Sequence, residues 1–183
     1  ALFFGKLILI YALFLIPWPG VRDGYAAAFR AGGNFLFRVF GDAGRVYFEP
    51  LEMTGKGFDA YDTNVVIHNI RKDIRGSIPG INTRLMGYLP TVFGAAMILA
   101  TPIPWRRRLV AACLGAALLS GFAALEMWLR LLETFSNPRE FALYEFAPWA
   151  RGLVLVVLKI VHMSPVTSYI VAAMVWILVA VRR

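Results

Sequence analysis

The chain has 183 residues, of which 59% are hydrophobic and only 16% are charged, whereas about 25% of residues are charged in typical soluble domains. This composition indicates an integral membrane protein. The net charge of +8 does not imply a nucleic-acid partner, because the densest basic cluster, Arg106 to Arg108, lies between two apolar runs, where short basic loops set membrane orientation.

Four apolar segments are long enough to span a bilayer, which needs about 20 residues with some allowance for tilt. They cover residues 2–18, 85–105, 109–132 and 166–181. The pattern predicts an all-α membrane protein with about four transmembrane helices. A fifth apolar stretch, residues 146–162, contains Arg151, Lys159 and His162, so we expect it to lie at the outer membrane interface or to cross the bilayer only in part.

Positive charge in short loops marks the cytoplasmic side of a membrane. Arg106 to Arg108 and the terminal Arg182-Arg183 both lie on that side if both chain termini are cytoplasmic. We therefore expect a multi-pass protein of a bacterial inner membrane, forming a single membrane domain over residues 1–183. Residues 19–84 are then a periplasmic insertion, and residues 133–165 an external loop that carries the interfacial helix.

The insertion is too long for a simple connector and should carry structure of its own. Residues 21–44 have the pattern of an amphipathic helix broken near Gly32-Gly33. Its aromatic side chains either contact lipid headgroups or pack on the protein itself, and they are Phe29, Phe35, Phe37 and Phe40.

A small β-hairpin is predicted further along the insertion, because residues 45–53 and 64–70 are rich in β-forming residues and flank a Gly- and Asp-containing turn. His68 lies on the second strand. A structural role suits a lone histidine best, and a pigment or haem ligand is the alternative. The following segment, "RGSIPGINTR" (75–84), reads as a Pro-Gly turn that leads into the second span.

Two charged residues lie at membrane depth near the outer end of the third span. Glu126 and Arg130 are four residues apart, so they share a helix face and can form an ion pair. Charges within a span are functional candidates by default. The pair is therefore either structural or part of a site that contacts lipid or a partner.

The familiar motifs of nucleotide binding, zinc proteases and serine hydrolases are missing, so neither a cofactor nor a metal is indicated. The single cysteine, Cys113, rules out an intrachain disulfide and a Cys-based metal cluster. It lies in an apolar run, and we expect it to be a buried small hydrophobic residue.

The order of features resembles the exosortase/archaeosortase family of membrane transpeptidases over residues 75–165. "IPGI" (78–81) stands where that family has a Cys-containing motif at the outer face, and "PWRRRL" follows as a Trp- and Arg-rich turn. Arg130 and His162 match the Arg and His positions. The resemblance implies an enzyme that has lost its nucleophile, because Ile78 replaces the Cys and has no atom that could attack a carbonyl.

Three functions follow from these observations. The first is a non-catalytic, structural or accessory subunit of a respiratory, photosynthetic or secretory membrane complex, whose partners are other membrane subunits and lipids. The second is a sortase-like enzyme that uses Ser77, Arg130 and His162. The third is a small transporter or lipid-binding protein with its site at Glu126 and Arg130.

Overall fold

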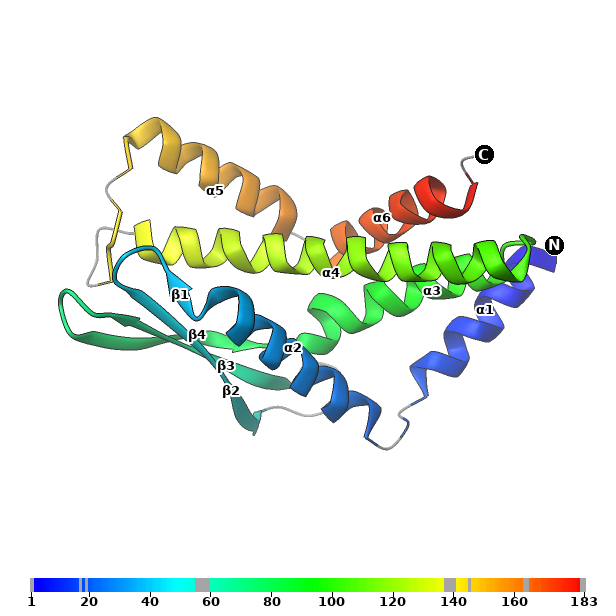
Figure 1. The fold of residues 1–183 in the computed structure, drawn as a ribbon, viewed down its shortest axis with the longest axis horizontal. Coiled ribbons are helices and arrows are strands. Elements are labelled where there is room, and N and C mark those ends of the chain that lie inside the picture. The colour runs from blue at the N-terminus through cyan, green and yellow to red at the C-terminus, as the bar shows by residue number, and fades with distance from the viewer. Residues whose placement is uncertain are drawn as a thin grey trace. The chain divides into compact units, whose positions relative to one another are not determined.

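The computed structural model describes residues 2–16, 18, 20–54, 60–136, 141–144, 146–162 and 165–181, without the side chains at 52–54, 79, 160–162 and 165. Arg182-Arg183, which helped to set the predicted orientation, lie outside this set. The chain divides into two compact units, each assembled from distant segments (Figure 1). Unit 1 contains residues 1–22, 84–123 and 164–183, and unit 2 contains residues 23–83 and 124–163.

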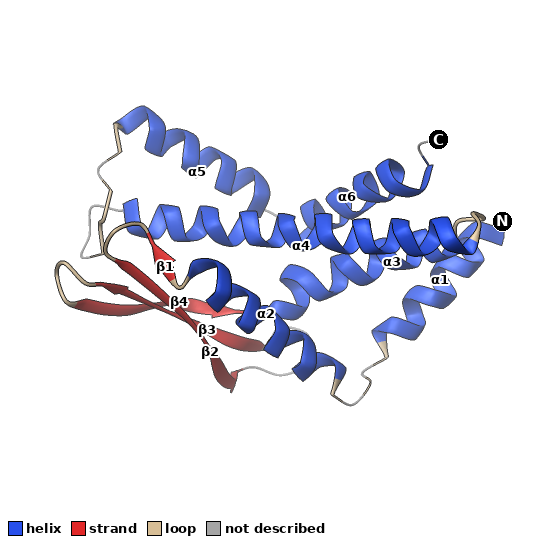
Figure 2. Cartoon of the chain, viewed as in Figure 1, coloured by secondary structure: helices blue, strands red, loops and turns tan. Residues whose placement is uncertain are grey.

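The regular secondary structure in the described residues of unit 1 is all helical (Figure 2). The helices are α1 (Leu2–Leu15), α3 (Leu89–Ala100), the first part of α4 (Trp105–Ser136) and α6 (Pro165–Trp176). A π-helical segment, Arg84–Tyr88, leads into α3, and a second, Ile177–Val181, continues α6. Helix α3 ends at Ala100 because the chain turns extended at Thr101, ahead of Pro102 and Pro104.

The core of unit 1 surrounds α3, most of whose residues are buried. Glycines bring its neighbours close. A Cβ on Gly94 would lie 2.9 Å from Leu119 of α4, and a Cβ on Gly115 would lie 2.9 Å from Ile98 of α3. On the other side, Phe93 packs edge-on against Tyr11 of α1 and Tyr169 of α6, whose hydroxyls are 3.2 Å apart.

The prediction of about four transmembrane helices is wrong. Within the described residues one helix, α4, is long and apolar enough to cross a membrane. The others are shorter: α1 has 14 residues, or about 21 Å at 1.5 Å per residue, and the apolar helix at Arg84–Ala100 gives about 25 Å on the same basis. Both fall short of the roughly 30 Å of hydrocarbon in a bilayer.

The all-α prediction is also wrong, because unit 2 contains a four-stranded antiparallel sheet. The strands lie in chain order: β1 (Val39–Phe40), β2 (Gly44–Thr54), β3 (Tyr61–Asn69) and β4 (Ile74–Ile81). The two segments expected to form a hairpin do pair, as β2 and β3. They form the centre of a larger sheet, which agrees with the marginal stability of an isolated hairpin in water.

The "IPGI" segment lies in β4 and not in a turn. Proline is excluded from central strands because it lacks an N–H, but an edge strand accepts it. Strand β4 is such an edge, and its pairing with β3 shifts register between Thr63 and Val65, opposite the Pro79-Gly80 pair. The Pro and Gly signals were correct as marks of irregularity and misleading about the type of element.

One face of the sheet is buried. Val46, Phe48, Val65 and Ile67 alternate along β2 and β3 and are almost fully buried. Helix α2 (Val21–Phe37) packs on this face. The remaining parts of unit 2 are the end of α4 and the helix α5 (Pro148–His162).

Helix α2 runs unbroken through Gly32 and Gly33, so the predicted break is wrong. A Cβ on Gly33 would lie 2.8 Å from the Phe48 ring. Glycine is needed here for close approach of helix and strand rather than for flexibility. Nearby, the Asn34 side chain donates to the Phe48 carbonyl (3.0 Å) and accepts from the Phe48 N–H (2.8 Å), which satisfies backbone groups of β2 beyond the short strand β1.

A buried polar cluster in unit 2 joins β3 to Thr83, which follows β4 in the chain. The Asp62 carboxylate accepts hydrogen bonds from the Thr83 hydroxyl (2.8 Å), the Thr83 N–H (3.3 Å) and the Thr63 hydroxyl (3.0 Å). Arg30 of α2 donates to the Asp62 carbonyl at 3.3 Å. Because three donors satisfy the Asp62 carboxylate, it can be buried at modest cost.

Candidate functional site

Unit 1 exposes apolar side chains on the outward faces of its helices. Helix α1 has no buried residue. Helix α4 buries a narrow stripe at four-residue spacing, Ala111, Gly115, Leu119 and Ala123, and leaves most positions between them exposed. The large exposed apolar residues include Leu2, Phe4, Ile8, Leu9 and Leu13 on α1, Leu109, Val110, Leu114 and Leu118 on α4, and Val166, Ile170 and Met174 on α6.

This surface, which we call the apolar belt, differs from the surface of an ordinary soluble domain. Only 28% of the most apolar window of α4 is buried, so α4 is not a helix enclosed in a protein core. Large exposed apolar side chains in such number mark contact with lipid or with another protein. Cys113, expected to be buried, is exposed within the belt because it falls between two residues of the buried stripe.

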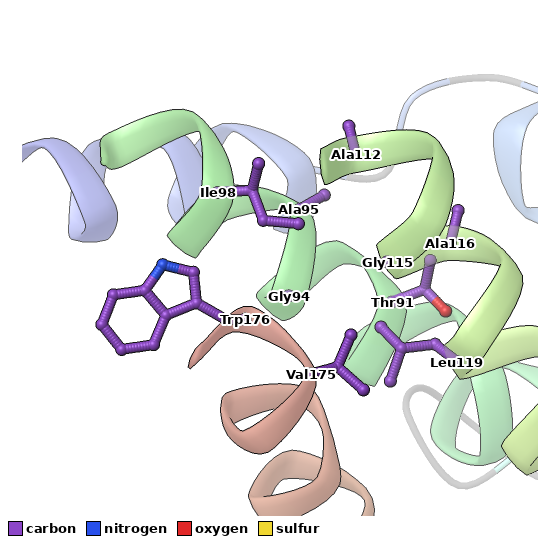
Figure 3. A pocket seen from close by; sticks show the side chains of 10 residues that line it. All are labelled: Thr91, Gly94, Ala95, Ile98, Ala112, Gly115, Ala116, Leu119, Val175 and Trp176. Atoms are coloured by element: carbon purple, nitrogen blue, oxygen red, sulfur yellow. The ribbon is translucent and has the colours of Figure 1, made fainter. Parts of the chain in front are cut away.

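A small cavity lies inside unit 1 between α3, α4 and α6. Figure 3 shows its lining, which is almost entirely apolar: Thr91, Gly94, Ala95, Ile98, Ala112, Gly115, Ala116, Leu119, Val175 and Trp176. Its volume of about 20 Å³ is roughly that needed by a single water molecule. The cavity is therefore a packing gap and offers no room for a transported substrate.

The predicted ion pair of α4 is confirmed. Arg130 Nη2 donates to Glu126 Oε1 at 2.8 Å. The Glu126 side chain is only 5% exposed and that of Arg130 is 23% exposed, so the pair is shielded from water and a matched charge offsets the desolvation of each partner. The structure establishes the pair itself, while its use as a lipid or partner site stays a prediction.

The three residues of the sortase-like hypothesis lie on three different elements of unit 2. Ser77 is exposed on β4, where its cross-strand partner is Val66. Arg130 lies on α4 in the pair with Glu126. His162 ends α5, and its side chain is outside the described set. His68 lies on the same face of the sheet as Ser77. Its directly opposed residue on β4 is Arg75, which is two residues before Ser77.

Three of the four phenylalanines named in the insertion pack on the protein itself, and one is exposed and available for contact with lipid or a partner. Phe29 and Phe37 pack against Phe48 of the sheet, and Phe40 stacks on Phe135 of α4 at 5.2 Å. These three contact the protein itself. Phe35 is 86% exposed and is the one ring of the four left free to contact lipid or a partner.

The structure also shows polar residues that sequence reasoning passed over. His68 Nε2 lies 3.1 Å from Asp73 Oδ1, and its cross-strand neighbours are Arg45 and Arg75. The alternation of polar and apolar residues in "RVYFEPLEM" already placed Arg45 on a polar face. Strand β4 was not predicted, because its Gly and Pro residues are typical of turns. The position of Arg75 next to His68 was therefore not predicted either.

Comparison of the chain with protein-family models, curated proteins and solved structures gave no match. The resemblance to exosortases therefore rests on the sequence pattern alone.

Proposed function

We propose that the protein is a non-catalytic, structural or accessory subunit of a larger membrane protein complex, located in a bacterial inner membrane. The observation that carries the proposal is the apolar belt of unit 1. Burying apolar surface is worth about 25 cal/mol per Å², so a belt of large aliphatic and aromatic side chains strongly favours a bilayer or an apolar partner over water.

The lengths of the helices favour a complex over a protein that stands alone in lipid. Helix α4 can cross a bilayer, whereas α1 and the Arg84–Ala100 helix are too short to do so. Short apolar helices are accommodated by local thinning of the bilayer or by association with other proteins. Helices of partner subunits would cover both the sides and the ends of α1, which lipid alone covers poorly.

The first test is mild-detergent extraction from native membranes, followed by native gel electrophoresis and mass spectrometry. A fixed set of partners at constant ratio is expected. A stable lone species, with no co-migrating protein in any mild detergent, would contradict the subunit proposal.

The membrane location can be tested independently because Cys113 is the sole cysteine and lies in the apolar belt. In native membranes it should resist a water-soluble maleimide and react only after denaturation. In a Cys113→Ala background, Arg106→Cys should react from the cytoplasmic side, as its basic cluster predicts, and Ser77→Cys from the periplasmic side. Reaction of all three cysteines alike in intact spheroplasts would exclude a membrane-embedded α4.

The sortase-like alternative is tested by Ser77→Ala with processing of a tagged substrate as the readout. Unchanged processing removes it. Since Ser77 is exposed on an edge strand, the replacement should leave the fold intact, and a negative result is then informative.

A further inference from the structure

The outer face of the sheet carries a row of basic side chains across three adjacent strands. Arg45 of β2 is directly opposite His68 of β3, and His68 is directly opposite Arg75 of β4. Directly opposed residues of an antiparallel sheet project from the same face with Cβ atoms roughly 5 Å apart. The three side chains, which we call the cationic row, therefore lie side by side.

The surroundings of the cationic row add positive charge. The turn between β3 and β4 supplies Arg71 and Lys72, both exposed. Two carboxylates partly balance the cluster: Asp73 contacts His68, and Asp42 lies 3.4 Å from Arg71. Both carboxylates are more than 90% exposed, so water screens their effect, and cations predominate at this end of the sheet.

The adjacent row of the same face is polar and uncharged at its edges. Tyr47 of β2 and Ser77 of β4 flank Val66 of β3. Tyr47 and Ser77 are exposed and carry hydroxyls that can donate hydrogen bonds. The acidic residue of this face, Glu49, lies one row further on, opposite Asn64. The charge on this face therefore changes along the strands, and it is positive at the end near the β3–β4 turn.

His68 has an arginine directly opposite it on each neighbouring strand and the Asp73 carboxylate 3.1 Å from its ring. The two arginines therefore leave positive charge in excess along the row. Arginine binds phosphate oxygens through paired N–H groups, so two guanidinium groups that flank an imidazole are well suited to a single phosphate.

We propose that the cationic row binds the phosphate of an anionic phospholipid headgroup. The cluster of Lys and Arg around the row supplies the positive charge that attracts a protein to an anionic surface, and an exposed sheet face can approach the surface of a bilayer. The proposal depends on the proposed function only for the presence of a membrane. Partner subunits play no role in it.

The test uses the full chain in a neutral detergent and reads the histidine ring signals by NMR. The protein has two histidines, so His68 is assigned from a single His68→Asn variant. Dihexanoyl phosphatidylglycerol is titrated in, with dihexanoyl phosphatidylcholine and inorganic phosphate as comparators. Saturable movement of the His68 signal is expected with the anionic lipid.

The variant Arg45→Gln, Arg75→Gln should bind the anionic lipid at least about tenfold more weakly for each guanidinium lost, which is the usual cost of removing a hydrogen bond to a charged group. The matched control is Arg38→Gln, which removes one charge from an exposed residue of unit 2 outside the row and is compared with Arg75→Gln. The control should bind as the parent does. Arg75→Gln alone repeats the test at an exposed position if the double variant fails to fold.

Three results would overturn the proposal. Equal binding of the anionic and zwitterionic lipids would show that charge is not recognised. Equal weakening in the control would show a general charge effect without a site. A His68 response to inorganic phosphate without one to the anionic lipid would indicate a site for a free anion. None of these results depends on the native-gel outcome, so failure of this proposal and failure of the proposed function remain distinguishable.

Discussion

The sheet of unit 2 and the helices of unit 1 differ in how they place their apolar side chains. In unit 2, Phe48 and Ile67 are buried while Arg75 and Ser77 on the same sheet are exposed, as in a soluble domain. In unit 1, residues such as Leu9 and Leu118 are exposed on predominantly apolar helices. The contrast shows that the average hydropathy of the chain combines two surfaces made for two different surroundings.

The largest expected effect follows from removing the central ring of unit 2. Phe48→Ala should destabilise unit 2 by about 3–5 kcal/mol, because the Phe48 side chain fills the space between α2 and the sheet. Phe4→Ala on exposed α1 is the matched change in unit 1 and should cost far less folding stability. Thermal unfolding in detergent compares the two. Equal losses would mean that the units do not differ in this way.

A charge placed in the apolar belt should disturb membrane insertion, whereas a charge on the exposed face of the sheet should not. Leu118→Lys should oppose membrane insertion of α4 by about 2.5–3.5 kcal/mol if it reaches the bilayer centre, and the protein should shift from the membrane fraction to aggregates or degradation products. Ser77→Lys on the exposed face of β4 should leave fractionation unchanged. If Leu118→Lys gives a soluble, well-folded protein, the belt does not contact lipid.

The adjacent glycines Gly32 and Gly33 of α2 differ in their surroundings, so replacing each by alanine should change the stability of unit 2 by different amounts. Gly33→Ala should destabilise the unit by about 1–3 kcal/mol, because the new methyl group would overlap the Phe48 ring. Chemical denaturation followed by circular dichroism measures the change. A neutral result would show that α2 can move away from the sheet without cost.

The smallest predicted effect has the opposite sign. Gly32→Ala meets nothing within 4 Å, so it should stabilise unit 2 by about 0.5–1 kcal/mol through the higher helix propensity of alanine. The same denaturation experiment serves for both glycines. Destabilisation at Gly32 would indicate that the helix is bent or crowded there, as the sequence pattern had suggested.

Several local features could be read directly from the sequence. The amphipathic character of α2, the pairing of β2 with β3 and the ion pair between Glu126 and Arg130 all depend on residues within about 25 positions of each other. Periodicity and spacing express such short-range geometry well. The apolar helices were also located correctly in sequence. The predicted runs 2–18 and 85–105 extend beyond their helices, which end at Leu15 and Ala100, whereas α4 extends beyond the predicted run 109–132 at both ends.

Tertiary structure alone decided the rest. Strand β4 exists because an edge position tolerates Pro79 and because Gly76 leaves space for the Phe141 ring, whose atoms would lie 2.3 Å from a Cβ there. Gly33 serves packing because Phe48, fifteen residues later, folds back over it. The cationic row arises only when strand register brings Arg45, His68 and Arg75 together. Composition and periodicity record what each residue prefers, whereas the partners that meet it across strands and helices depend on how the whole chain folds.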